Sequence, residues 1–482
     1  MPSHIPSISG YRTLSFILFS LLMATLTAQS STGIFDRSVD LGTGSGASGT
    51  TQYDAVTQTY RLAAPTDDGA RRYLWTTLQG DFILRAEITF PEETASRSAG
   101  WTLRDHLGLQ APEVEGMVSA TEAVADEPHV VELARTGDSL SFRTARFGEP
   151  LQLQWTRQDT LRNELFAGLT VKGGAGAQVQ YRNVRITHPA PETLVPYRDY
   201  LGSRLELMDV ETGLRTVVLN SDHSLQAPNW TADGKYLLYN SNGFLYRYRL
   251  SDGYVDMLNT GFATRNNNDH VLSFDGSQLG ISHHVAEEDG ASTIFVLPVE
   301  GSDAPRRITL PNVGHSYLHG FSPDAKQVVF TGGRNDKYDI YLADVDTGEE
   351  TAVTDTPGLD DGPEFSADGR YIYFNSNRSG MMQLWRVEPD GSYPTRLTED
   401  HEYNDWFPHL SPDGRDIIFL SFGTDVESSQ HPFYKHVTLR TMPVAGGEPK
   451  ILAYIYGGQG TINVPSWSPD GKYVAFVSNT GR

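Results

Sequence analysis

The fold is decided by a stretch in the C-terminal half of the chain, Phe365-Ser366-Ala367-Asp368-Gly369-Arg370-Tyr371-Ile372-Tyr373-Phe374. It joins an Asp-Gly turn to an alternating apolar strand, a combination that predicts a tight hairpin. The Ser-x-Asp-Gly marker, or a close variant of it, recurs at intervals of about 40 to 55 residues, which is typical of a propeller or solenoid. The six copies begin at Thr231, Ser273, Ser322, Ser366, Ser411 and Ser468.

Each repeat predicts a four-stranded antiparallel blade. In the repeat of Ser366, the second strand is followed by a third around Leu384, a turn at Asp390-Gly391-Ser392 and a short fourth strand that ends in Arg-Leu-Thr. The aspartate of the marker supplies an acceptor for the turn, so we interpret it as structural and not catalytic. Ala325 replaces the glycine in one copy, which predicts a slightly different turn there.

The two ends of the repeat region are expected to share one blade. The last repeat stops after Phe476, two strands into a blade, and the segment Ser203 to Val218 supplies a third and a fourth strand before the first marker. A shared blade removes the open sheet edges and closes the ring. Five complete blades and the shared one predict a six-bladed β-propeller.

These markers resemble the PD40 (WD40-like) repeats of TolB-type six-bladed propellers. The segment after the marker of Ser366 adds to the resemblance: Asn375-Ser376-Asn377-Arg378-Ser379-Gly380. The resemblance covers the region from Tyr200 to Arg482. It implies a binding or interaction module of the cell envelope whose partner, an envelope protein or a glycan, docks on the funnel face. The repeat is specific for fold and says little about function.

The region before the repeats is expected to be a β-sandwich. Period-two segments predict strands at Tyr60-Arg61-Leu62, Phe82 to Ile88, Val130 to Leu133 and Ser141-Phe142-Arg143, each with apolar residues inward and polar residues outward. The predicted organisation is a signal peptide at 1–28, a sandwich at 30–188, a proline-containing linker at 189–200 and the propeller at 201–482. The whole chain is thus predicted to be all-β.

The N-terminal region also resembles the concanavalin-like sandwiches of secreted carbohydrate-active proteins. The residues that carry this resemblance are Ala99 to Asp105, Phe166 to Thr170 and Tyr181 to Ile186. Such sandwiches often bind glycans, although many only pack against a neighbouring domain.

Export is predicted from the N-terminus. Arg12 precedes an apolar run from Leu14 to Leu26, and small residues follow up to Ala28. The run is too short to span a bilayer and fits a secretory signal, with an uncleaved anchor as the alternative. We therefore expect a periplasmic or secreted protein with no membrane span after signal cleavage.

Composition narrows the partners and the chemistry. The net charge of −22 and the pI near 5.0 argue against binding to nucleic acid or to anionic lipids. The chain has no cysteine, which excludes disulfides, thiol catalysis and cysteine-based zinc sites. No Gly-x-Ser-x-Gly elbow accompanies the repeats, so a prolyl-peptidase interpretation lacks its catalytic half.

Candidate functional residues gather on the face opposite the Asp-Gly turns. Loops that enter the inner strands or join the second and third strands carry them: His223, Asn268, Asp269, His270, His283, His284, His319, Arg334, Asp361, Glu364, Arg378, Asp405, Trp406 and His409. His270 and His319 occupy the same repeat position, and His409 comes one residue later.

Two kinds of chemistry fit this set of residues. Converging imidazoles and carboxylates could hold a divalent metal through His270, His319 and His409, or supply a general base. Arg334 and Arg378 could bind a carboxylate of an acidic sugar, or form salt bridges between neighbouring blades. Trp406, Asp361, Glu364 and His223 are the candidate ligand-binding residues, with packing as the alternative for Trp406.

The sequence leaves two functions open. The first is an exported binding module of the cell envelope. The second is a carbohydrate-active enzyme, a lyase or hydrolase of an acidic polysaccharide, with its active site in the propeller funnel. The histidines would then be metal ligands or bases and an arginine would neutralise the uronate.

Overall fold

The computed structural model describes residues 32–42, 46–67, 69–91, 97–121, 127–173 and 177–481. Within these ranges the protein is all-β, as predicted, with one 3-10 turn, η1 (Ala286–Glu288), as its helical element. The predicted signal peptide at 1–28 lies outside the described residues. None of the helical segments in the described part of the chain has the length and apolar character that a membrane crossing requires.

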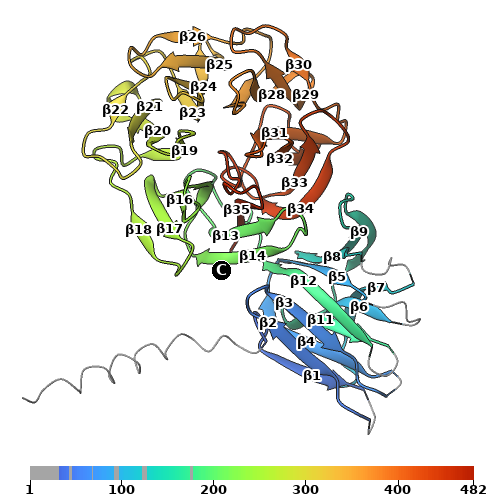
Figure 1. The fold of residues 1–482 in the computed structure, drawn as a ribbon. Helices are drawn as coiled ribbons and strands as arrows, with labels where there is room; N and C mark the ends of the chain where they lie inside the picture. The colour runs from blue at the N-terminus through green and yellow to red at the C-terminus, as the bar shows by residue number, and fades with distance from the viewer. Residues whose placement is uncertain are drawn as a thin grey trace, which may run out of the picture.

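The N-terminal part consists of two antiparallel sheets, which we call the sheet pair (Figure 1). The five-stranded sheet has the order β1 (Arg37–Leu41), β4 (Arg71–Gln79), β11 (Glu164–Lys172), β6 (Ser98–Arg104) and β7 (Glu113–Ser119). The seven-stranded sheet has the order β10 (Gln152–Gln158), β9 (Ser139–Arg146), β8 (His129–Thr136), β5 (Phe82–Thr89), β12 (Gln178–Thr187), β3 (Thr59–Ala63) and β2 (Thr50–Asp54). One hydrophobic core, which includes Trp101, Leu133 and Tyr181, joins the two sheets. The assignment of this part to the concanavalin-like family and the predicted domain bounds stay predictions.

Five complete four-stranded blades surround the axis of the propeller (Figure 1). Blade 1 contains β15 (Gln226–Trp230), β16 (Tyr236–Ser241), β17 (Phe244–Arg249) and β18 (Val255–Met257). Blade 2 contains β19 (Asn266–Leu272), β20 (Gln278–Val285), β21 (Ala291–Pro298) and β22 (Arg306–Arg307). Blade 3 contains β23 (Ser316–Phe321), β24 (Gln327–Arg334), β25 (Lys337–Asp344) and β26 (Glu350–Ala352).

Blade 4 contains β27 (Asp360–Phe365), β28 (Ile372–Ser379), β29 (Met381–Val387) and β30 (Thr395–Arg396), and blade 5 contains β31 (Tyr403–Leu410), β32 (Asp416–Gly423), β33 (Lys435–Pro443) and β34 (Lys450–Gly457). A sixth, closing blade is shared between the ends of the propeller, as predicted. It pairs β35 (Tyr473–Thr480) with β13 (Gly202–Asp209), which in turn pairs with β14 (Arg215–Ser221). Trp467 forms an isolated bridge to Val474 at the inner position of this blade.

The marker turns are structural, and they share one geometry. In the turn of blade 4, the Ser366 hydroxyl donates to Asp368 Oδ1 at 2.7 Å, and this oxygen also accepts the backbone N–H of Arg370 at 3.1 Å. Gly369 follows with φ +69°. Ala325 keeps the turn with φ +56°, and its N–H donates to the Ser322 carbonyl at 2.9 Å. The expected difference at Ala325 is therefore only that a residue with a Cβ atom is held in the left-handed region.

Part of the polar face of the seven-stranded sheet does not face solvent. Arg61 on β3 is exposed, as expected, but polar residues of β5 and β8 are buried, which corrects the expectation that they point outward. Arg85 and Glu87 of β5 are buried because this face packs against the propeller (Figure 1). Glu206 of β13 is fully buried between the guanidinium groups of Arg185 on β12, at 2.6 Å, and Arg215 on β14, at 2.8 Å. Buried charges of this kind need partners with good geometry. The sheet pair is therefore docked on the closing blade through ion pairs.

The segment expected to be a linker is also packed against the propeller. The Ala190 N–H donates to the Tyr456 hydroxyl at 2.8 Å, and the Leu201 N–H donates to the Tyr434 hydroxyl at 3.0 Å. The Tyr200 ring lies 5.8 Å from the Phe433 ring in an edge-to-face contact. Its prolines set its course, but hydrogen bonds to blade 5 fix its position.

The Ala325 turn predicts a change in stability. Ala325→Gly removes left-handed strain of about 1–2 kcal/mol and adds about 0.5–1 kcal/mol of unfolded-state entropy. We therefore expect the free energy of unfolding to rise by about 0.5–1 kcal/mol. Urea unfolding of the full chain measures it. The matched control, Gly369→Ala, should lower stability, and a destabilised Ala325→Gly protein would contradict the interpretation.

Glu206 predicts a dependence of stability on pH. Burial opposes ionisation, but Arg185 and Arg215 hold the pKa of Glu206 well below its usual range. Because the pKa of Glu206 is lower in the folded protein, ionised Glu206 stabilises the fold at any pH above the pKa of a glutamate in the unfolded chain, about 4.3. This stabilisation is lost progressively as the pH falls below that value. Glu206→Gln should cost about 3–5 kcal/mol because it leaves two guanidinium groups without their carboxylate. Chemical denaturation between pH 3 and 7 measures both effects. The exposed substitution Glu300→Gln is the control, and equal losses in the two variants would refute the role of Glu206.

Candidate functional site

A cavity of about 1010 Å³ lies at the centre of the propeller, on the face opposite the marker turns. Residues that enter the inner strands and residues between the second and third strands line it, as the repeat geometry predicts. Side-chain amides are frequent in the lining: Gln226, Asn240, Asn242, Asn266, Asn267, Asn268, Gln459 and Asn463. The cavity is at the large end of ligand sites, and groups that donate and accept hydrogen bonds line it.

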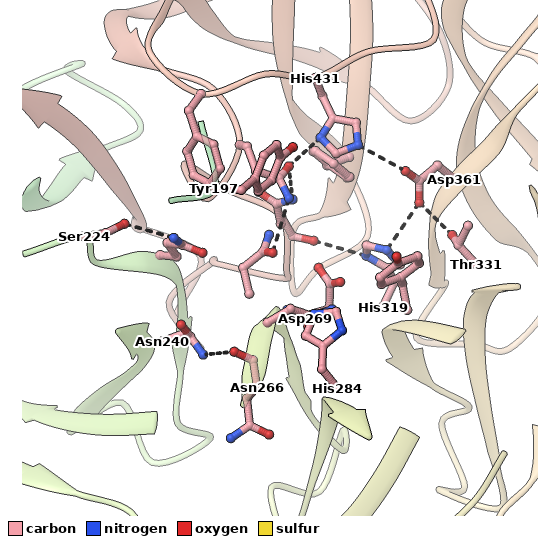
Figure 2. A pocket seen from close by; sticks show the side chains of 18 of the residues that line it. Tyr197, Ser224, Asn240, Asn266, Asp269, His284, His319, Thr331, Asp361 and His431 are labelled. Atoms are coloured by element: carbon pink, nitrogen blue, oxygen red, sulfur yellow. Dashed lines mark hydrogen bonds and ion pairs between the residues drawn. The ribbon is translucent and has the colours of Figure 1, made fainter. Parts of the chain in front are cut away.

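The charged centre of the cavity is built around Asp361 (Figure 2). Asp361 Oδ1 accepts a hydrogen bond from the Thr331 hydroxyl at 2.7 Å and lies 3.4 Å from His319 Nε2. Asp361 Oδ2 lies 3.7 Å from His431 Nε2. His319 Nδ1 lies 3.3 Å from the Asn463 carbonyl, so both of its nitrogens face acceptors. This geometry suits a protonated His319.

The electrostatics agree with that geometry. Burial opposes ionisation of Asp361, but the hydrogen bond to His319 and the charges of His319 and His431 lower its pKa to about 2. Burial also opposes protonation of His319, yet its hydrogen bond to Asp361 and the charges of Asp269 and Asp361 raise its pKa above the ordinary value. Burial lowers the pKa of His431. These shifts favour an ion pair between Asp361 and His319 and the neutral form of His431.

Asp269 is the other carboxylate of the cavity, and its environment differs. Its side chain is buried, with 6% of the residue exposed, and its carboxylate makes no hydrogen bond or ion pair with any described residue. Burial raises the pKa of Asp269 to about 7, with His319 lowering it and Asp361 raising it. Figure 2 shows the Asp269 side chain pointing toward the interior of the cavity.

Bulges in the inner strands explain which residues reach the cavity. In β23 the register shifts between Leu318 and Gly320, so His319 is the extra residue and has no partner on β24. In β19 the shift spans the residues between Asn266 and His270, which include Asp269. A bulge re-aims a side chain and bends the strand. Asp269 and His319 come from these irregular positions, whereas Asp361 pairs with Asn375 directly before the register shift in β27.

The predicted trio of histidines does not converge. His270 is fully buried, pairs in regular register with Ile281 and does not line the cavity. Burial lowers its pKa to about 4. His409 likewise follows a bulge, and both of its nitrogens are occupied, at 2.7 Å from Glu364 Oε2 and 2.8 Å from the Ile462 carbonyl. Of the three, only His319 lines the cavity, because the other two lie past the bulge, where the ladder is regular.

Metal binding by these side chains is not supported. Among the described residues, no group of three or more His, Cys, Asp or Glu side chains is arranged to hold a metal ion. Glu364 is occupied by His409 and by the Leu410 N–H and does not line the cavity. His223 is exposed and also lies outside the lining.

The two candidate arginines are held within their own blades. Arg334 pairs with Glu350 at 3.0 Å and donates to the His315 carbonyl at 2.6 Å. Arg378 pairs with Asp360 at 2.7 Å, with its guanidinium 4.9 Å from the centre of the Trp385 ring. Neither side chain lines the cavity, and neither bridges to another blade through these ion pairs. The sequence predicted salt bridges between neighbouring blades, whereas each of these two ion pairs lies within one blade.

Trp406 is a packing residue in this fold. It is fully buried, and its ring packs against His431 with the ring centres 4.5 Å apart. Its indole therefore lies behind a cavity residue and does not offer a face to a ligand.

Several cavity residues were missed from the sequence. His431 and Ser429 lie in the segment 424–434, which joins the second and third strands of blade 5, whereas residues 242–243 make the same connection in blade 1. The long insertion was a visible signal. Gln459 and Asn463 come from the glycine-containing segment before Pro465, and Tyr197 and Tyr200 from the expected linker. The sequence gives no signal that these four residues reach the cavity, because this depends on the path of the chain in the fold.

The fold and the cavity define a six-bladed β-propeller with a polar central funnel. Residues 285–481 match the family described as the TolB beta propeller domain. An uncharacterized protein of Agrobacterium fabrum, Atu1656, is 46% identical over 278 residues, which are 57% of this chain and 92% of that protein. The chain therefore belongs to the TolB-like β-propeller family.

Two further proteins are similar to this chain. The solved structure of a putative TolB from Agrobacterium tumefaciens has a TM-score of 0.55 and 44% identity, covering 59% of this chain and all of that one. The Tol-Pal system protein TolB of Francisella tularensis subsp. tularensis is 25% identical over 289 residues. These are 57% of this chain, and they span 61% of the Francisella protein.

The Asp361–His319 pair predicts a measurable titration. In the native protein the pKa of His319 should lie above the ordinary value, and Asp361→Asn should bring it below that value because burial then dominates. Histidine-detected NMR titration of the full chain measures both values. The lowered pKa of His270, which burial causes without a contribution from Asp361, serves as the internal reference. An unchanged His319 titration in Asp361→Asn would refute the pairing.

Proposed function

We propose that this protein is an exported interaction module of the cell envelope, and that its partner docks at the mouth of the central cavity. The observation that carries the proposal is the cavity itself, about 1010 Å³ in volume and lined by amide and aromatic side chains. Such a site recognises a ligand by hydrogen bonds and ring contacts. Export follows from the predicted signal peptide and is part of the proposal.

The family supports a binding role. The Francisella relative is named as a component of the Tol-Pal system. That name belongs to the relative, and a corresponding assembly for this chain is our inference. The sheet pair is docked on the closing blade through buried ion pairs, so a partner would meet one continuous body.

The enzyme alternative finds less support in the geometry. Arg334 and Arg378, proposed to neutralise an acidic sugar, are occupied by carboxylates of their own blades. His270 and His409 do not line the cavity. His319 offers no free nitrogen as a general base, because one ring nitrogen faces Asp361 and the other faces the Asn463 carbonyl. Glycan binding by the sheet pair stays a prediction.

Photo-cross-linking in cells tests the proposed docking site. A photoreactive residue at the exposed position Arg265, which lines the cavity, should cross-link to a discrete partner. Adding Ser429→Trp, on the exposed part of the same lining, should abolish the cross-link because the indole blocks the mouth. Immunoblotting against a tag on this chain measures the adduct.

The control places the same photoreactive residue at Lys235, in a marker turn on the opposite face. We expect no adduct there. Cross-links of equal yield from the two faces, or an Arg265 adduct that survives Ser429→Trp, would refute docking at the cavity. Turnover of a polyuronide by the purified chain would instead support the enzyme alternative.

A further inference from the structure

We propose that the free carboxylate of Asp269 receives the protonated amine of a lysine side chain that a partner polypeptide inserts into the cavity. This inference rests on the proposed function and names the chemistry of its central contact. It depends on three features of the cavity: an acid without a partner, a charge balance that leaves this acid uncompensated, and a lining that suits an organic cation with an aliphatic stem better than a metal ion.

The first feature is the isolation of the carboxylate. Asp269 is 6% exposed, and its backbone N–H is held by Asn267 Oδ1 at 3.0 Å, which fixes the strand around it. Its carboxylate has no hydrogen-bond or ion-pair partner among the described residues. A buried carboxylate without a partner is costly, so buried acids are normally paired. A cation from outside would remove this cost.

The second feature is the charge balance around Asp269. Asp361 and His319 neutralise each other as an ion pair, and burial favours the neutral form of His431. Arg265 lines the cavity but is exposed to solvent. When Asp269 is ionised, the interior of the cavity therefore carries one uncompensated negative charge, in a protein whose net charge is −22. The field of the cavity attracts cations.

The third feature favours an organic cation over a metal ion. Asp361 is committed to His319 and Thr331, and the described residues offer no cluster of three metal-binding side chains. Aromatic rings of Tyr317 and Phe407 line the cavity with Asp269. A lysine combines a compact charge with three donors and a four-carbon stem that packs against apolar surface. An amino sugar, which carries its ammonium group directly on the sugar ring without a flexible stem, is the competing occupant.

The pH dependence of binding follows from the same site. Burial raises the pKa of Asp269 to about 7, and an ammonium group needs the ionised form. The other titratable groups that line the same cavity are Arg265, His284, His319, Asp361 and His431, with the tyrosines Tyr197, Tyr200, Tyr317 and Tyr338. Of these, His319 contacts Asp361 at 3.4 Å, and that contact raises the pKa of His319. Affinity for an amine should therefore fall by roughly tenfold between pH 8 and pH 6, as protons compete for the carboxylate.

A titration with small probes tests the proposal. Ligand-observed NMR on the full chain at pH 8 compares Nα-acetyl-lysine N-methylamide with Nα-acetyl-norleucine N-methylamide, which has the same stem without the charge. We expect the lysine probe to bind at least about tenfold more tightly, as a charge-assisted contact in a buried site would produce. Asp269→Asn, which keeps the shape, should abolish the preference.

Controls separate this contact from general electrostatics. Asp346→Asn removes the same charge at an exposed turn and should leave the preference intact. Thermal unfolding verifies that Asp269→Asn is folded, and the pH profile of the native chain is a second test that needs no variant. Equal binding of the two probes, or a preference that survives Asp269→Asn, overturns the proposal.

Two outcomes distinguish this inference from the proposed function. Tighter binding of methyl glucosaminide than of the lysine probe would assign the carboxylate to an amino sugar and overturn the lysine contact. If the Arg265 cross-link is lost in Ser429→Trp but unchanged in Asp269→Asn, docking at the cavity stands and the lysine contact fails. Loss of the cross-link in both variants supports the two proposals together.

Discussion

The ladder between β13 and β35 joins the two ends of the propeller, and the rest of the structure depends on it. Eight residue pairs, from Gly202 with Thr480 to Asp209 with Tyr473, connect segments that lie at opposite ends of the repeat region. Without this ladder the inner strands would not surround a closed funnel, and two sheet edges would be open. Glu206 lies within the same ladder and binds Arg185 of the sheet pair. Closure of the ring and docking of the N-terminal part therefore rest on one strand.

The closed ring also fixes the cavity, because the groups that meet there come from different blades. Asp361 belongs to blade 4, His319 and Thr331 to blade 3, and His431 to the insertion of blade 5. A change in the rotation of one blade would separate these atoms. Rigid strands are better supports for such a set than loops are. The hydrogen bond from His319 to the Asn463 carbonyl adds the segment before the closing blade to the same network.

Sequence reasoning recovered the repeat architecture because its cause is local. An Asp-Gly turn needs an acceptor and a positive φ, and Asp368 and Gly369 supply them. Ring closure could also be predicted, because the repeat region begins and ends with an incomplete blade. The histidines failed for a different reason. His270 and His319 share a repeat position, but a bulge of a single residue sends one into the cavity and leaves the other in the ladder. Bulges depend on tertiary packing, and spacing alone does not reveal them.

One backbone position, four residues before the marker, has a positive φ angle in three blades. Ala227, Gly362 and Phe407 lie at the same position before the marker in blades 1, 4 and 5, and all three have positive φ angles. Phe407 is a bulky residue in a conformation that costs energy, with its N–H held at 2.9 Å by Asn375 Oδ1. Strain of this kind persists where surrounding structure enforces it, and it clusters at functional sites. The strained backbone of Phe407 at the cavity wall and the unpaired carboxylate of Asp269 both cost stability, and a bound cation would offset the second of these costs.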